Sequence, residues 1–162
     1  MTSRHTVDLS GYPDLVVIYL GMRANGWRGL GTLFRLGPQL QRAVEPKPEG
    51  LLHTDLNIIF SLFPLHVGFR QYWRDFAALE KWTRELPHQQ WWKDFMRDSG
   101  GTGFWHETYF VRGGMEAIYL DLPQPPGLGA FAPVVTPKGG MFSARRRLRL
   151  EGEGPAPPVS EP

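Results

Sequence analysis

The stretch DLVVIYLGMRAN, residues 14–25, decides how the fold of this 162-residue chain is interpreted. It is rich in β-branched and aromatic residues and contains no proline, which is typical of a mostly buried strand. Alternation along a strand places Val16, Ile18, Leu20 and Met22 on one side, and it places Tyr19, Arg23 and Asn25 on the other. The stretch therefore predicts a strand with one apolar face and one face that carries polar groups.

Downstream of this strand, apolar residues at helical spacing predict a helix over residues 30–43, which Gly37-Pro38 should kink or restart. Residues 51–63 and 65–73 are rich in strand formers. Pro64 lies between them and suits a turn but not a central strand. These two runs therefore predict a β-hairpin.

Helical spacing returns over residues 76–95, and Pro87 predicts that this helix is long or broken. Residues 103–111 (GFWHETYFV) and the short run 115–122 are expected to be strands. The order strand, helix, strand, strand, helix, strand indicates an α+β, ferredoxin-like fold, in which helices cover one face of an antiparallel sheet.

Composition divides the chain into three expected parts. Residues 1–13 form an N-terminal arm and residues 14–122 the ferredoxin-like domain. The remaining 40 residues, 123–162, contain nine prolines and six glycines. A segment of this kind buries little apolar surface to offset its ordering cost, so it is expected to be a tail.

Several classes of function are excluded by composition. The chain has no cysteine, which removes disulfides, zinc fingers and iron–sulfur clusters, and its net charge of +2 predicts no nucleic-acid partner. The longest apolar stretch, residues 56–69, is too short to span a bilayer. No signal peptide or nucleotide-binding motif is found, so a soluble, cytoplasmic protein without a membrane partner is expected.

Aromatic residues are concentrated in the second half of the predicted domain. Of 21 aromatic residues, 14 lie between Phe60 and Phe110, including five of the six tryptophans. They could form a packed aromatic core. They could instead line a cavity between the second helix and the sheet, where a few polar groups would fix a ligand.

Three polar residues are candidates for chemistry in such a cavity. Arg23 could hold an anionic group, or simply pair with a carboxylate at the rim. His106 could transfer a proton or ligate iron, or be a hydrogen-bonded core histidine. His106 and Glu107 are neighbours in a predicted strand, so without a bulge their side chains should lie on opposite faces of the sheet. His88, beside Pro87, is the other candidate, and the remaining histidines fall at the periphery.

Four strings carry a resemblance to a known group: GMR (21–23), QYWRDFAALEKW (71–82), WWKDF (91–95) and FWHETYFV (104–111). They resemble small monooxygenase-like proteins of bacteria and fungi that are related to the antibiotic biosynthesis monooxygenases. The resemblance extends over roughly residues 15–122. It implies a dimeric α+β barrel, in which two ferredoxin-like units join their sheets.

The resemblance also implies a monooxygenase-like oxidoreductase that oxidises a hydrophobic aromatic or terpenoid-like metabolite without flavin or metal, with a homodimer and a hydrophobic substrate as partners. His106 would then be the base and Arg23 the anion partner. The other residues assigned to the substrate site are Tyr19, Trp73, Trp82, Trp92 and Phe95.

Two other functions stay open. One is a haem-binding enzyme of the same superfamily, such as a dehydratase, a peroxidase-like enzyme or a haem-handling protein. The sequence departs from the haem-degrading branch near Trp92, where that branch has its iron-ligating histidine, so His88 or His106 would have to supply the ligand. The other function is a non-catalytic, small-molecule-binding or cyclase-like protein.

Overall fold

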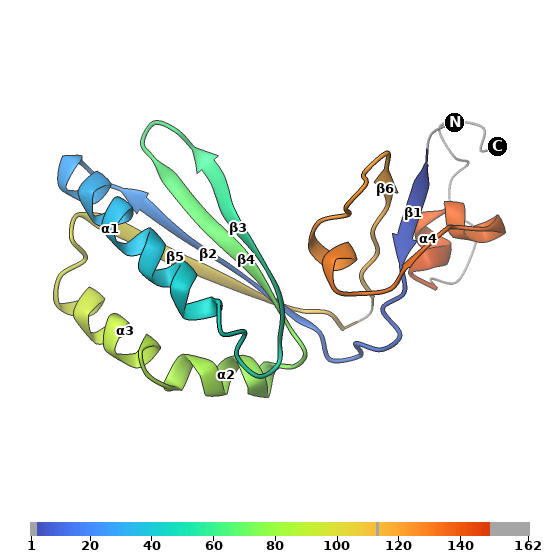
Figure 1. The fold of residues 1–162 in the computed structure, drawn as a ribbon, viewed down its shortest axis with the longest axis horizontal. Helices are drawn as coiled ribbons and strands as arrows, with labels where there is room; N and C mark the ends of the chain where they lie inside the picture. The colour runs from blue at the N-terminus through green and yellow to red at the C-terminus, as the bar shows by residue number, and fades with distance from the viewer. Residues whose placement is uncertain (1–2, 113, 150–162) are drawn as a thin grey trace. The chain divides into compact units, whose positions relative to one another are not determined.

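The computed structural model describes residues 3–112 and 114–149, and it divides the chain into two compact units (Figure 1). The larger unit comprises residues 14–110. The smaller unit combines residues 1–13 with residues 111–162. Each unit has a sheet of its own, so the two are considered separately.

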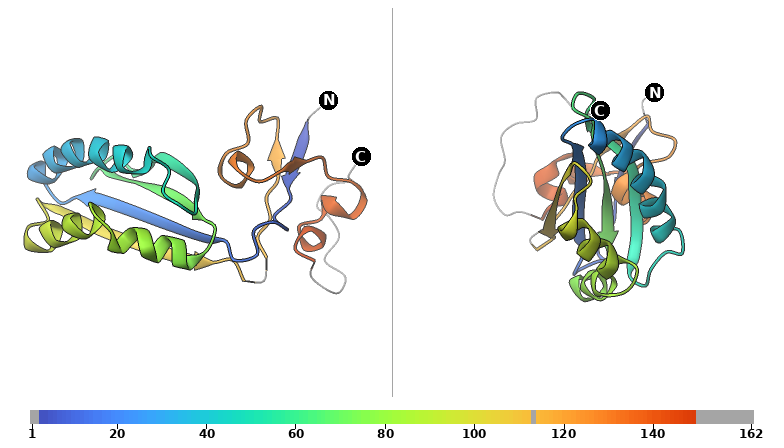
Figure 2. Two further views of the ribbon diagram at one scale, coloured as in Figure 1. Left: turned by 60° about the horizontal axis from the view of Figure 1, so that its bottom comes forward. Right: turned by 90° about the vertical axis from the view of Figure 1, so that its left-hand side faces the viewer.

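The larger unit contains a four-stranded antiparallel sheet and three helices. The strands are β2 (Val16–Ala24), β3 (Leu51–Ser61), β4 (His66–Trp73) and β5 (Thr102–Phe110), in the spatial order β3-β4-β2-β5. The helices are α1 (Trp27–Val44), α2 (Phe76–Arg84) and α3 (His88–Arg97), and they lie on one side of the sheet (Figures 1 and 2). The predicted ferredoxin-like α+β fold is confirmed.

The helix-covered face of the sheet holds the hydrophobic core. Along β2, Val16, Ile18 and Leu20 point to this face, and they pack with residues of β3, β4 and α2. We call this side the covered face. The opposite side, which carries Tyr19 and Arg23, is called the open face. The alternation predicted for residues 14–25 is therefore present in the folded chain.

The helices follow the predicted order and differ in detail. The first helix runs without interruption from Trp27 to Val44 and contains Pro38, where a kink or restart was expected. Pro38 is exposed, so the carbonyl that loses its partner there can reach water. The second helix is broken at Pro87, as predicted. The N-terminus of α2 is capped by Asp75, whose carboxylate accepts a hydrogen bond of 2.8 Å from the Ala78 amide.

The smaller unit differs from the expected arm and tail. Strand β1 (Arg4–Val7) pairs with β6 (Tyr119–Leu120) on one side and with β7 (Val134–Val135) on the other. The described part of this unit also contains three short helices: η1 (Gly127–Ala130), η2 (Gly139–Phe142) and α4 (Ala144–Arg147). Backbone pairing thus joins residues near the start of the chain to two segments after residue 118. The part of the predicted tail over residues 150–162 lies outside the described residues.

This smaller unit also buries apolar surface, which the composition of the predicted tail did not suggest. Leu128 and Ala132 are each 6% exposed, and Tyr119 is buried as well. The Thr6 hydroxyl donates a hydrogen bond of 2.6 Å to the carbonyl of Ala117. The prolines and glycines therefore connect short paired segments rather than preventing them.

Candidate functional site

The sheet divides the residues that the sequence assigns to one site into two groups. Strand β5 pairs with β2 so that His106 lies opposite Leu20, whereas Arg23 lies opposite Gly103. His106 is therefore on the covered face, together with the assigned tryptophans and Phe95. Tyr19 and Arg23 are on the open face. A single pocket cannot contain both groups, because the sheet lies between them.

The aromatic rings along the covered face form a series of two contact groups. The Trp82 ring lies 5.4 Å from that of Trp73 and 4.8 Å from that of His88, measured between ring centroids. Farther along, Phe104 lies 5.8 Å from Trp92 and 5.9 Å from Phe95. The structure thus brings together four of the five residues predicted to bind substrate.

The inner end of this series is filled by side chains. Trp73 is 0% exposed, and its indole N–H donates a hydrogen bond of 3.2 Å to Oε1 of Gln71. Gln71 is also 0% exposed, and its Nε2 has no partner in the described parts of the chain. Trp73 is therefore a core residue. Trp92 is 48% exposed, so the outer end of the series is accessible.

Two histidines lie near one another at the accessible end, and both were candidates from sequence. His88 is the first residue of α3 and is half-buried, while His106 is exposed on β5, with its ring 6.0 Å from that of Phe104. Burial and the nearby His106 lower the pKa of His88. A hydrogen bond to the backbone of Thr83 raises this pKa, but by less. We call these histidines, with Trp82, Trp92 and Phe104, the covered-face site.

The hydrogen bond of His88 determines what its ring can do. One ring N–H is used by the backbone of Thr83, which leaves the other nitrogen with a lone pair. A neutral imidazole of this kind can accept a proton or bind a metal. A ring N–H held by a carbonyl also orients many histidine ligands of metals. His88 could therefore hold the iron of a haem as well as act as a base, although the described residues contain no cluster of three metal-binding side chains.

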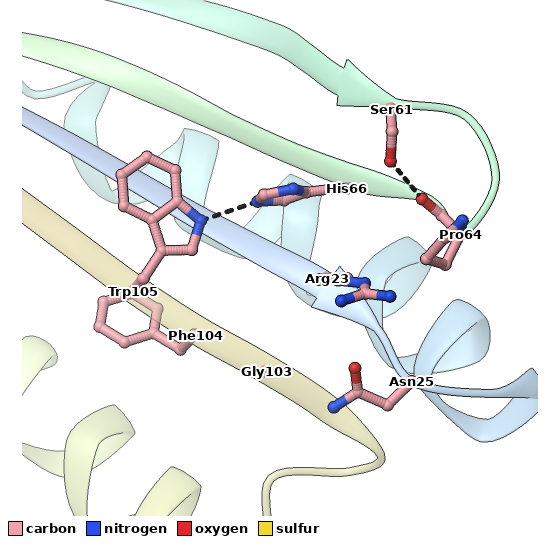
Figure 3. A pocket seen from close by; sticks show the side chains of 8 residues that line it. All are labelled: Arg23, Asn25, Ser61, Pro64, His66, Gly103, Phe104 and Trp105. Carbon is pink, nitrogen blue, oxygen red and sulfur yellow. Dashed lines mark hydrogen bonds between the residues drawn. The ribbon is translucent and has the colours of Figure 1, made fainter.

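A separate pocket of about 540 Å³ lies at one end of the open face (Figure 3). It is formed where β2 ends, where β3 turns into β4 and where β5 begins. We call it the rim pocket. Its lining includes Arg23, Asn25, Ser61, Pro64, His66 and Trp105.

The rim pocket contains two residues that the sequence did not single out, His66 and Trp105. The Trp105 indole N–H donates a hydrogen bond of 2.7 Å to Nε2 of His66. A Cβ at Gly21 would lie only 2.4 Å from Nε1 of Trp105, so the indole ring lies directly over this glycine. His66 was expected at the periphery. It lies beside Arg23 in the β2–β4 register, which the sequence of neither strand reveals by itself.

Tyr19 belongs to a third group, an ion-paired network in the middle of the open face. Arg70 donates hydrogen bonds of 2.8 and 2.6 Å to Oδ2 of Asp55 and one of 2.8 Å to the Tyr19 hydroxyl. His53 contacts the other Asp55 oxygen at 2.9 Å. Burial raises the pKa of Asp55, but hydrogen bonds from Arg70 and His53 outweigh it, so the pKa lies below its usual value. Tyr19 is thus already engaged by Arg70.

Comparison with known proteins adds to this geometry. The model of the monooxygenase af470-like family matches residues 15–128. The chain belongs to this family. The resemblance drawn from the sequence motifs is therefore confirmed, and membership supports an enzymatic role as an oxidoreductase. No curated protein matches the chain.

Solved structures share the fold of this family member. Crystal structures of aldoxime dehydratase match at 22% identity, one with a TM-score of 0.66 over 83% of this chain and 39% of the other. A second, OxdRE with butyraldoxime, has a TM-score of 0.70, also at 22% identity, over 90% of this chain and 42% of the other. The chain thus spans about two fifths of the length of these dehydratases.

A smaller protein also matches, SnoaB, a cofactor-independent oxygenase from Streptomyces nogalater. It has a TM-score of 0.46 and 12% identity, over 63% of this chain and 97% of that protein. Within the described part of this chain, no helix combines the length and apolar character needed to cross a membrane.

Proposed function

We propose that this family member oxidises a hydrophobic aromatic or terpenoid-like small molecule with molecular oxygen, at the covered-face site and without flavin or metal. The observation that carries the proposal is the half-buried His88, whose pKa is lowered and whose second ring nitrogen is available beside His106. Trp82, Trp92 and Phe104 supply flat apolar surface around these imidazoles.

The reaction that suits this site starts from a substrate with an acidic methylene group. His88 accepts a methylene proton, because a neutral imidazole in apolar surroundings is a competent base near neutral pH. The resulting carbanion donates electrons to oxygen and forms a carbon–oxygen bond. Loss of water then converts CH₂ and O₂ into C=O and H₂O. The substrate supplies all of the electrons, so no reductant is required.

His106 has a complementary role in this proposal. It is exposed at the outer end of the site, where it can return a proton to the departing oxygen and exchange protons with solvent. The aromatic side chains offer flat apolar surfaces against which planar substrates can stack. Trp92, which is partly exposed, is the wall that an incoming substrate meets.

Oxygen consumption tests the proposal. Anthrone is a suitable probe, because it combines fused aromatic rings with an acidic methylene. We expect the purified protein to consume oxygen with anthrone, and His88→Gln to lower the rate by about 100-fold. His53→Gln, on the open face, is the matched control and should retain the rate. Unchanged activity in His88→Gln would rule out the proposed base.

Haem binding is the second candidate function, and the hydrogen bond between His88 and the Thr83 backbone favours it. Bound haem would supply redox or Lewis-acid chemistry that the side chains lack. Titration with hemin distinguishes this candidate: a Soret shift that His88→Ala abolishes would support it. If a shift occurs, butyraldoxime is the first probe, because it is the ligand of the similar OxdRE structure.

Binding of anthrone without its oxidation would support the third function, a non-catalytic, small-molecule-binding or cyclase-like protein. A colourless protein that binds anthrone and consumes no oxygen would be a binding or cyclase-like protein. Calorimetry with anthrone, alongside the oxygen electrode, therefore separates binding from catalysis in the same preparation.

We also propose a homodimer that joins the two open faces. The β3–β4 hairpin supports this, because Phe60, which packs against His66 on this face, is 40% exposed, and Leu62 and Phe63 at the turn are 62% and 95% exposed. The open face is only partly apolar, since the pair of Arg70 and Asp55 lies at its centre. Sedimentation should show a dimer that Phe63→Asp dissociates, whereas Phe34→Asp, on α1, should leave it intact. A monomeric wild-type protein would refute the proposal.

A further inference from the structure

The rim pocket has a cation without a counter-ion. The Arg23 side chain is exposed and forms no hydrogen bond or ion pair with any of residues 3–112 and 114–149. None of the residues that line the pocket is acidic. The Asn25 side chain, from the end of the same strand, adds an amide to the lining (Figure 3). The polar side of the pocket is therefore suited to an anion.

The other side of the pocket is a preformed aromatic surface. Trp105 lies over Gly21, and its hydrogen bond to Nε2 of His66 fixes the orientation of both rings. Phe60 packs against this pair, with its ring 4.7 Å from that of His66 and 5.3 Å from that of Trp105. Rings that are already held in place bind a planar ligand without a further ordering cost.

The hydrogen bond from Trp105 also determines what His66 presents. An indole N–H can only donate, so Nε2 of His66 is the acceptor and carries no proton. In the neutral imidazole, the proton is then on Nδ1. His66 consequently offers a donor, which agrees with the donors of Arg23 and the Asn25 amide.

We infer that the rim pocket is a second binding site, which takes a small organic anion that joins a carboxylate to a planar aromatic group. The carboxylate binds the guanidinium of Arg23, whose planar fork matches two carboxylate oxygens. The aromatic group lies along Trp105. A volume of about 540 Å³ accommodates a ligand of two or three fused rings.

This site is distinct from the covered-face site: Phe104 contributes to both, and the sheet separates their other residues. Failure of the oxygenation proposal would therefore leave this inference standing, and the reverse is also true.

Titration followed by NMR tests the inference. The probes are 2-naphthoate and its neutral analogue 2-naphthamide, and the signal is the Trp105 indole N–H, assigned with Trp105→Phe. We expect 2-naphthoate to shift this signal and to bind about tenfold more tightly than 2-naphthamide. Equal affinity for the two probes, or an unmoved Trp105 signal, would overturn the inference.

Variants of Arg23 test whether its guanidinium binds the carboxylate of the ligand. Arg23→Gln should lower the affinity for 2-naphthoate about tenfold, to that of 2-naphthamide, and Arg23→Lys should lie between the two. Arg35→Gln removes an exposed arginine of α1 outside the pocket and should bind as wild type does. If His88→Gln abolishes binding while Arg23→Gln preserves it, the ligand occupies the covered-face site and the inference is wrong.

Discussion

Two adjacent glycines of the open face allow a quantitative prediction about the aromatic surface of the rim pocket. Gly21 and Gly68 pair across β2 and β4. A Cβ at Gly21 would lie 2.4 Å from Nε1 of Trp105, at the end of a side chain that can rotate. A Cβ at Gly68 would lie 2.0 Å from the backbone carbonyl oxygen of Leu20. This backbone atom cannot rotate away as a side chain can. The same substitution should therefore have different costs at the two positions.

The cost of Gly21→Ala follows from what Trp105 loses. Its hydrogen bond to His66 contributes about 1 kcal/mol, and the packing of a half-buried indole about 1.5 kcal/mol. Replacing glycine by alanine in a strand stabilises the folded state by about 0.5 kcal/mol, which offsets part of this loss. We expect the free energy of unfolding to fall by about 2 kcal/mol. For Gly68→Ala the strands must move apart, with a loss of ladder hydrogen bonds, so we expect at least about 3 kcal/mol.

Urea unfolding followed by circular dichroism measures both changes, and the Trp105 indole signal reports whether the ring has moved. Gly21→Ala should displace that signal and lower the affinity for 2-naphthoate while the fold persists. Wild-type stability together with an unmoved indole signal in Gly21→Ala would refute the reasoning, and so would equal costs for the two glycines.

Three further predictions concern the covered-face site, its core and the open face. The pKa of His88 in the folded protein lies below its unfolded value of 6.5, so its contribution to stability is complete above pH 6.5 and is lost as the pH falls below that value. In urea unfolding, His88→Gln should therefore reduce the fall in the free energy of unfolding at acidic pH. Asp55→Asn should lower the free energy of unfolding by about 2 kcal/mol at pH 7, and this difference should shrink only below about pH 4, since the folded pKa of Asp55 lies below 3.8. Trp73→Phe should lower stability by about 2 kcal/mol, measured in the same way, whereas Trp92→Phe should raise KM for anthrone with little change in stability.

The fold of the larger unit could be predicted because its signals are local. Period-two alternation marks residues 14–25, and Pro64 and Pro87 mark the turn and the helix break where the structure has them. The pairing of Arg4–Val7 with two short segments after residue 118 could not be predicted. Strands of two residues have no detectable periodicity, and their pairing depends on contacts more than 100 residues apart in sequence.

Only part of the arrangement around the candidate sites could be predicted from the sequence. Alternation correctly separates His106 from Glu107, because it is a property of one strand. Whether Arg23 shares a face with His106 depends on the register between β2 and β5, which neither strand encodes alone. In the observed register His106 lies opposite Leu20, so it shares the covered face with Leu20. Arg23, three residues farther along β2, therefore lies on the open face.

Each group suits the side of the sheet on which it lies. On the covered face, apolar surroundings favour a neutral imidazole, and this is the state in which His88 can accept a proton. A guanidinium there would need a buried counter-ion, and desolvation would offset much of the attraction between the two charges. At the rim of the open face, Arg23 keeps its charge in contact with water and can attract an anion from solution. The sheet therefore separates proton transfer from anion recognition, and a substrate bound at His88 needs no carboxylate to be held there.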